Sequence, residues 1–164
     1  MIAFPIHIVA VAALLLPAGA PDRTVQVSGG GFDSLNTAIV HEKHDTPTGS
    51  IQKSTETVEL TGDLIGRVLY QVTTVIDNVH GTLVNTGDSV FSGTIAGSAP
   101  VMILDDQSRF DVNLVTGQER GQVSLVQAIT GPKVRCTLDV VGTGLNADGN
   151  PTFTYTGQCT FRGE

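Results

Sequence analysis

The sequence has few aromatic and few charged residues, and these shortages limit the classes of protein that it can encode. Its 164 residues include no Trp, and only 5% are aromatic and 15% charged. Past residue 22, no stretch places Ala, Leu, Glu and Lys at the period of a helix, whereas Gly, Val and Thr recur throughout. Val and Thr favour strands, and Gly favours tight turns. The composition therefore predicts an all-β protein.

Basic residues are scarce as well. The chain has nine Lys and Arg residues and 16 Asp and Glu residues, which gives a formal net charge of −7. The first 20 residues contain none of these charged side chains. An acidic domain repels nucleic-acid phosphates and anionic lipid headgroups. We therefore expect no nucleic-acid partner and no membrane partner once the N-terminal segment is removed, and the charge serves solubility. A homo-oligomer is left open.

The sequence also lacks the motifs of several enzyme classes. It contains no Gly-x-Ser-x-Gly, no Walker loop, no dinucleotide fingerprint and no His-Glu-x-x-His. The segment 41–45 has two histidines and two carboxylates, but it lies at a strand end beside a loop with Pro and Gly, so we expect a solvated segment. The sequence thus predicts no cofactor and no metal site, and it leaves open whether the protein is an enzyme.

One long apolar run is present, at the N-terminus. Residues 2–16 are almost entirely apolar, interrupted only by Pro5 and His7, and Pro17-Ala18-Gly19-Ala20 follows. An apolar run before small residues is typical of a secretory signal peptide. We expect residues 1–20 to be a signal peptide and 21–164 to be one domain, secreted or periplasmic. An uncleaved anchor is the alternative, since the run approaches the length of a membrane span.

The two cysteines, Cys136 and Cys159, lie in segments that alternate apolar and polar residues. Between these segments Asn146–Gly149 forms a strong turn signal. If Leu145 faces Asn150 across this turn, Cys136 falls opposite Cys159, within reach of a disulfide. Exported proteins form such bonds. We predict a Cys136–Cys159 disulfide, with two buried thiols as the alternative.

Short alternating segments separated by turn signals extend along the chain. They predict strands at 23–28, 35–42, 55–61, 67–77, 81–85, 89–96, 101–104, 109–115, 122–129, 134–141 and 152–161. A flexible Gly29–Gly31 separates the first two. A sheet with one polar and one apolar face is typical of antiparallel strands. To bury its apolar face, such a sheet must either close into a barrel or stack on a second sheet. The predicted fold is a single antiparallel β-barrel of about eight strands, with a β-sandwich as the alternative.

A resemblance to a known family rests on two glycine-punctuated strand segments. Residues 60–66, Leu-Thr-Gly-Asp-Leu-Ile-Gly, and 93–97, Gly-Thr-Ile-Ala-Gly, resemble the small barrels of the allene oxide cyclase-like superfamily, including its bacterial members of uncharacterised function. The resemblance covers residues 54–161 and implies an eight-stranded antiparallel barrel with an apolar lumen. Some members cyclise an apolar substrate inside the barrel. The catalytic motif of the plant enzymes is absent at matching positions, so the resemblance does not extend to their reaction.

Two groups of polar residues are candidate sites. Asp105, Asp106, Arg109 and Asp111 concentrate charge near one turn, but without the spacing of a calcium loop. We expect them to form a polar rim. Acid–base work by paired carboxylates is the alternative.

Three further polar residues, Tyr70, Gln127 and Tyr155, interrupt the apolar faces of their strands. If the barrel is hollow, they would bind and orient a ligand. The alternative is that each is hydrogen-bonded to backbone or lies at the barrel rim.

Three functions follow from this fold. The leading hypothesis is an exported barrel that binds a small apolar molecule in its lumen. The first alternative is a cyclase- or isomerase-type enzyme acting on a hydrophobic substrate there, and the second is a structural or adhesive surface domain without a ligand. An open apolar cavity would favour the first two, and a filled interior the third.

Overall fold

The computed structural model describes residues 20–163, apart from the side chain of Asp106. The predicted signal peptide therefore lies, except for Ala20, outside the described residues. No helix within this range is long and apolar enough to cross a membrane. The elements in chain order are β1 (Arg23–Asp33), the short 3-10 helix η1 (Leu35–Thr37), β2 (Ile39–Thr46), β3 (Gly49–Gly62), β4 (Leu64–Asp77), β5 (Thr82–Ile95), β6 (Val101–Asn113), β7 (Gln118–Leu125), β8 (Gln127–Thr130), β9 (Val134–Leu145) and β10 (Pro151–Phe161).

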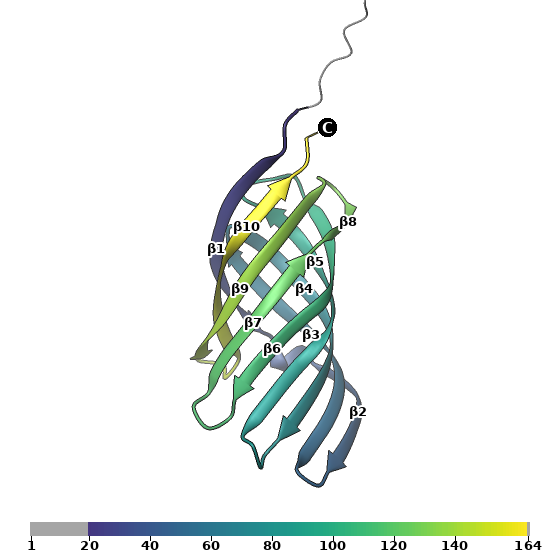
Figure 1. Cartoon of the computed structure of the whole chain (residues 1–164), viewed down its shortest axis with the longest axis vertical. Coiled ribbons are helices and arrows are strands. Elements are labelled where there is room, and N and C mark those ends of the chain that lie inside the picture. The colour runs from purple at the N-terminus through teal and green to yellow at the C-terminus, as the bar shows by residue number, and fades with distance from the viewer. Residues whose placement is uncertain (1–19, 164) are drawn as a thin grey trace, which may run out of the picture.

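Eight of these strands close into an antiparallel barrel, which confirms the predicted fold. Neighbours pair in the order β1-β10-β9-β7-β6-β5-β4-β3, and β1 pairs again with β3 to complete the ring (Figure 1). Strand β2 pairs with β3 beyond the end of β1, and β8 pairs with β6. Because the ring is continuous, the alternative of two stacked sheets does not apply.

The two ends of the barrel differ. At one end, which we call the closed end, Arg23 of β1 pairs with Phe161 of β10, so both chain termini leave the barrel there. The hairpin turns β2–β3, β4–β5, β6–β7 and β9–β10 lie at the opposite end, which we call the open end (Figure 1).

The hairpin of β9 and β10 has the predicted register over most of its length. Cys136 pairs with Cys159, and their sulfur atoms form a disulfide with a Cα–Cα distance of 4.1 Å. The register shifts by one residue near Thr152, so Leu145 faces Pro151 instead of the expected Asn150. The predicted disulfide is therefore confirmed, and the register prediction is wrong only beside the turn.

The Gly29–Gly31 segment was expected to be flexible and to separate two strands, but it is part of β1. Gly29 pairs with both Tyr155 of β10 and Gly62 of β3. A Cβ atom at Gly29 would lie 2.1 Å from the Thr61 carbonyl oxygen and 2.3 Å from the Tyr155 hydroxyl. The missing side chains thus let β1 close the barrel against an aromatic ring.

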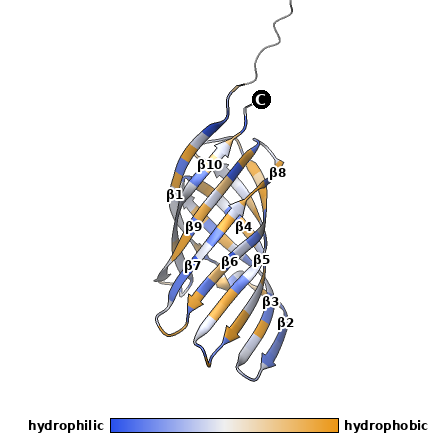
Figure 2. Ribbon diagram, viewed as in Figure 1, coloured by the Kyte–Doolittle hydropathy of each residue, from blue (hydrophilic) through white to orange (hydrophobic). Residues whose placement is uncertain are grey.

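Apolar side chains fill the half of the barrel next to the closed end, which we call the filled half. Phe91, Ile95 and Ile103 are completely buried there, and Leu64 joins them from β4. The disulfide belongs to the same cluster. Hydrophobic and hydrophilic bands alternate along the strands (Figure 2), because successive residues point into and out of the barrel.

Candidate ligand-binding site

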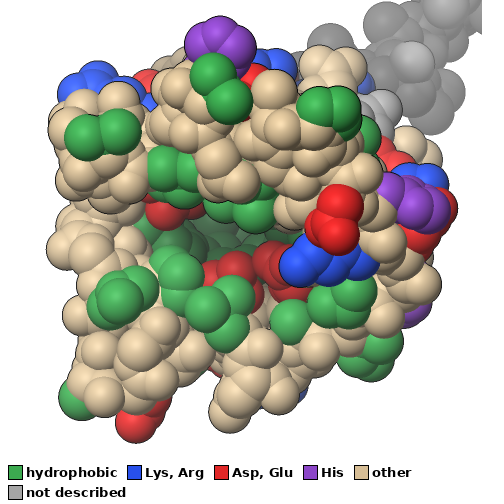
Figure 3. Space-filling model, turned by 90° about the horizontal axis from the view of Figure 1, so that it is seen from below, with side chains coloured by type: hydrophobic (Ala, Val, Ile, Leu, Met, Phe, Trp, Pro, Cys, Tyr) green, Lys and Arg blue, Asp and Glu red, His purple; other side chains and the backbone are tan. Residues whose placement is uncertain are grey.

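The other half of the barrel encloses a cavity of about 670 Å³. We call it the hollow half. Viewed from the open end, the molecule is hollowed at its centre, where hydrophobic and acidic side chains gather, with a Lys or Arg side chain at the edge of the hollow (Figure 3). The apolar part of the wall comes from strands on all sides and includes Val58, Val68, Phe110, Val112, Val123 and Phe153. Leu35 and Leu145 line its outer part and are themselves exposed. The cavity is therefore an apolar space that solvent or a ligand can enter from the open end.

A polar row crosses the inner wall where the filled half meets the hollow half. Glu56, Tyr70, Ser89 and Asp105 are direct neighbours on β3, β4, β5 and β6. All four are buried, and the first three line the cavity. Polar side chains in such a position need partners, either within the protein or in the cavity.

Asp105 obtains its partners from the protein. It is completely buried and accepts hydrogen bonds from the backbone N–H groups of Gln107 (2.8 Å) and Ser124 (3.0 Å). A bulge in β6 follows it, because the register with β5 shifts between Gly87 and Ser89. The bulge lets Asp105 and, further along, Phe110 both face inward. The expectation that Asp105 lies at an exposed rim is wrong.

Arg109 and Asp111 lie on the outer wall of β6 and not at a rim around the cavity. They form an exposed two-pronged ion pair, with Nε–Oδ2 and Nη2–Oδ1 distances of 3.0 and 2.7 Å, which lowers the pKa of Asp111. The side chain of Asp106 is not among those described. Residues 20–163 contain no group of three His, Cys, Asp or Glu side chains that could hold a metal ion.

Three carboxyl groups reach the cavity from different strands: Asp33 at the end of β1, Glu56 on β3 and Glu119 on β7. Burial, followed by the charge of Glu56 and a hydrogen bond with it, raises the pKa of Asp33 to about 7. Burial also raises the pKa of Glu119 above its usual range. Glu56 accepts a hydrogen bond from the Ser54 hydroxyl (2.7 Å). Asp33 can thus keep a proton near neutral pH, beside the carboxyl group of Glu56.

Three buried polar atoms of the described residues have no hydrogen-bond partner: Asp33 Oδ1, the Tyr70 hydroxyl and Asn85 Oδ1. All three residues line the one cavity. An unpaired buried group costs about 1–3 kcal/mol. These three side chains therefore place unsatisfied polar groups in an otherwise apolar cavity wall, although the three atoms themselves have almost no accessible surface.

Tyr70, predicted to face the lumen, is buried and lines the cavity. Its ring packs edge-on against Phe110, with centroids 6.3 Å apart. Burial raises the pKa of Tyr70 to about 12, so its hydroxyl is protonated at neutral pH. The nearby Ser108 hydroxyl partly offsets this rise in pKa. Ser108 donates its own hydrogen to the Gly87 carbonyl (2.8 Å), and it forms no hydrogen bond of normal geometry with the Tyr70 hydroxyl.

Tyr155 lines the inner end of the cavity, but the protein itself binds its hydroxyl. That oxygen accepts a hydrogen bond from the Leu64 N–H (2.8 Å) and donates one to the Thr61 carbonyl (3.0 Å). It therefore ties β10 to the turn between β3 and β4. Of the alternatives left open for this residue, the structure shows the backbone-bonded one.

Gln127 does not face the cavity, so the expected inward orientation is wrong. It lies exposed on β8 and is not among the lining residues. Val126 interrupts the strand after the buried Leu125, and its N–H donates to the Leu104 carbonyl. The interruption ends the alternation that placed Gln127 in phase with Leu125.

The sequence reading missed Asp33, Glu56, Asn85 and Glu119. One signal was available for Glu56, because it alternates in phase with the apolar Val58 on the same strand. Asp33 follows the glycine triplet that was read as a linker, and it had no such signal.

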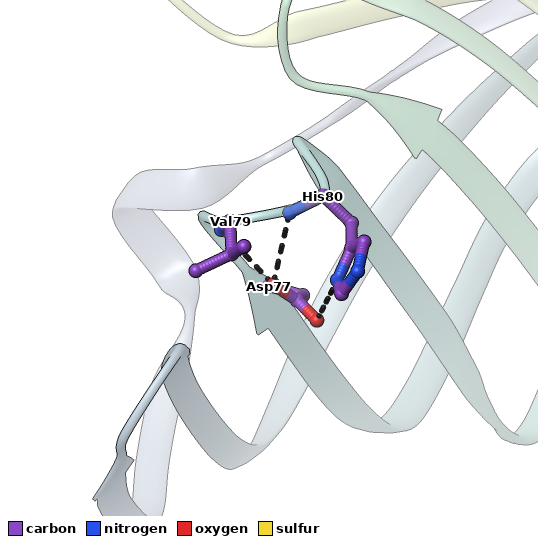
Figure 4. A network of polar contacts seen from close by, with 3 residues as sticks. All are labelled: Asp77, Val79 and His80. Atoms are coloured by element: carbon purple, nitrogen blue, oxygen red, sulfur yellow. Dashed lines mark hydrogen bonds and ion pairs between the residues drawn. The ribbon is translucent and has the colours of Figure 1, made fainter.

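A polar network at the open end has a structural role. The Asp77 carboxylate accepts hydrogen bonds from the backbone N–H groups of Val79 (3.0 Å) and His80 (3.1 Å) and pairs with His80 Nδ1 at 2.8 Å (Figure 4). These contacts hold the pKa of Asp77 below its usual range. They fasten the β4–β5 turn between Ile76 and Leu83, two residues of the cavity wall.

Comparisons of the chain with protein-family models, with curated proteins and with solved structures found no match. The structure thus shows an eight-stranded antiparallel barrel and identifies no family.

Proposed function

We propose that this protein is an exported barrel that binds a small, largely apolar molecule in the hollow half. The observation that carries the proposal is one apolar cavity lined by three residues, Asp33, Tyr70 and Asn85, that each have a buried polar atom without a partner. If the interior were filled with apolar side chains, these polar atoms would stay without hydrogen bonds and would lower the stability of the fold. An occupant of the cavity supplies their partners.

The size and mouth of the cavity support this function. Its volume of about 670 Å³ lies within the range of about 300–1,000 Å³ that is usual for small-molecule sites. At the mouth, Leu35 and Leu145 are 47% and 69% exposed. Apolar side chains at an entrance favour capture of an apolar molecule.

The disulfide supports export. Such bonds persist in oxidising compartments, outside the reducing cytosol. Together with the predicted signal peptide, it favours a secreted or periplasmic location.

A second candidate, an isomerase- or cyclase-type enzyme, is favoured by the pair Asp33–Glu56. A carboxyl group with a pKa of about 7 can both donate and accept a proton near neutral pH. The resemblance to allene oxide cyclase-like barrels points in the same direction. The hollow interior weighs against the third candidate, a purely structural or adhesive domain.

Titration with a hydrophobic fluorescent dye tests the proposed function. We expect saturable binding by the folded protein. Val68→Phe, which adds a ring to the cavity wall, should weaken it. Leu69→Phe is the matched control, because Leu69 is the next residue on β4 and is 54% exposed on the outer wall.

Two outcomes would reject the proposal: no binding by the wild type, or equal weakening by both variants. To separate the enzyme candidate, a molecule that co-purifies with the protein is incubated with it and analysed by mass spectrometry and chromatography. Conversion to an isomer supports the enzyme, and unchanged release supports a carrier.

A further inference from the structure

We propose that the ligand of the hollow half carries a positively charged nitrogen with N–H groups on an apolar body, as an alkylamine does. Asp33, with Glu56 beside it, and the Tyr70 hydroxyl receive that nitrogen. This inference rests on the proposed function, since it names the chemical class of molecule that the same cavity takes.

The first argument for a cationic ligand is the negative charge of the cavity wall. Three carboxyl groups line it, from Asp33, Glu56 and Glu119, and none of the described lining residues is Lys, Arg or His. An anionic ligand would lose its hydration and meet only like charge. A cation would gain charge-assisted hydrogen bonds in a site of low dielectric constant.

Hydrogen-bonding capacity carries the second step. Two of the unpartnered atoms, Asp33 Oδ1 and Asn85 Oδ1, are acceptors, and the Tyr70 hydroxyl can also accept. An ammonium group has three N–H donors and no acceptor. The donors of an ammonium group therefore complement the acceptor atoms that the protein leaves unpaired. A second N–H group on the ligand would donate a hydrogen bond to Asn85 Oδ1.

The environment of Asp33 carries the third step. Its carboxyl group interacts with Glu56 from β3 and Glu119 from β7, and it acts on Tyr70 of β4, so every titratable group that faces it is acidic. With no cation present, burial and then this repulsion raise the pKa of Asp33 to about 7, so its carboxyl group keeps a proton part of the time near neutral pH. An ammonium group replaces that proton and relieves the repulsion. Affinity for the cation should therefore rise between pH 6 and pH 8.

Calorimetry with three probes of equal chain length tests this inference: octylamine, 1-octanol and octanoate, all at pH 8. We expect octylamine to bind about tenfold or more tightly than octanol, because a hydrogen bond to a charged group contributes about 1.5–3 kcal/mol. Octanoate should bind most weakly. Asp33→Asn should remove most of the preference for the amine and leave the affinity for octanol nearly unchanged.

Asp88→Asn is the matched control. Asp88 is exposed on β5, so this variant loses the same charge without altering the cavity. It should keep the full preference for the amine, which excludes general attraction of a cation to an acidic protein. If Asp33→Asn fails to fold, two other measurements test the same preference. Glu119→Gln, on another strand of the cavity wall, should reduce the preference for octylamine over octanol, and octylamine affinity should rise between pH 6 and pH 8.

The outcomes distinguish this inference from the proposed function. Octanol or octanoate binding as tightly as octylamine would overturn the amine preference and leave a lumen that binds apolar molecules. An equal loss of preference in Asp33→Asn and Asp88→Asn would also overturn it. No binding of any probe, and none of the hydrophobic dye, would overturn both.

Discussion

The filled and hollow halves are built from the same strands, yet their inner faces have different chemistry. On β5, Phe91 and Ile95 are completely buried in the filled half, whereas Leu83 and Asn85 line the cavity. The change occurs at the polar row that includes Tyr70 of β4. One half therefore provides the packing that stabilises the barrel, and the other has polar side chains in an apolar cavity wall. A single sheet can separate a packed core from a cavity along its strands.

Glycines on the inner face make room for aromatic rings in both halves. Gly121 faces inward on β7, and a Cβ atom there would lie 2.0 Å from the Phe110 ring. The ring thus lies against the wall where a larger residue would displace it. In the filled half the completely buried ring of Phe91 lies against Gly93 in a similar way, since a Cβ atom there would lie 2.9 Å from it. The comparison predicts that equivalent changes in the two halves have unequal effects.

The largest effect is expected from Phe91→Ala. Removing a completely buried Phe loses apolar contacts and leaves a cavity, which costs about 3–5 kcal/mol of unfolding free energy. Leu83→Ala, on the same strand in the hollow half, should cost much less because its side chain already faces open space. Urea unfolding monitored by circular dichroism measures both. Similar losses would contradict the distinction between the halves.

The next effect is the loss of the disulfide. Replacing Cys136 and Cys159 together by Ala should cost roughly 3 kcal/mol, since the bond restricts the unfolded chain. Dye binding should survive in the folded variant, because the bond lies in the filled half. Intact-mass analysis after alkylation, with and without reductant, checks the bond itself. Two thiols modified in unreduced, denatured protein would show that the bond is absent.

The two tyrosines should separate stability from binding. Tyr155→Phe removes the partner of the Leu64 N–H and should cost about 1–3 kcal/mol. Tyr70→Phe removes a hydroxyl that no protein group binds, so stability should change little while the affinity for octylamine falls. Thermal unfolding and calorimetry on both variants test this. A large loss of stability in Tyr70→Phe would mean that its hydroxyl has a structural partner.

The smallest expected effect is on the pH dependence of stability. The pKa of Asp33 is about 7 in the folded protein, above its value of 3.8 in an unperturbed chain. A raised carboxyl pKa favours folding at low pH, and this contribution is lost as pH rises through 7. Without ligand, the melting temperature should therefore rise from pH 8 to pH 5.5. Asp33→Asn should flatten this rise, and an unchanged slope would exclude Asp33 as its source.

The sequence predicts those parts of the molecule where alternation is uninterrupted. The Cys136–Cys159 pairing follows from two regular strands and a strong turn signal, and it is confirmed. Alternation fails at irregularities: the bulge in β6 reverses the phase between Asp105 and Phe110, so that both face inward, and the break at Val126 turns Gln127 outward. Each irregularity reverses the side of the sheet on which later residues lie, and no local signal marks it.

The candidate site could be predicted only in part for the same reason. The inward position of Tyr70 follows from its strand. Asp33 becomes a lumen residue only because β1 lies between β10, the last strand, and β3, where Asp33 pairs with Val58. That contact depends on closure of the whole barrel, and local sequence patterns do not contain it.

The pairing of β1 with β10 also has a consequence for how the protein folds. Most strands pair with the next one along the chain, and such hairpins close short loops. The barrel is complete only when Val25 meets Cys159, near the far end of the chain. A chain that emerges from its N-terminus must therefore hold β1 unpaired on this edge until its final strand arrives. Long-range closure of this kind is slow, so the nascent protein exposes open sheet edges for most of its assembly.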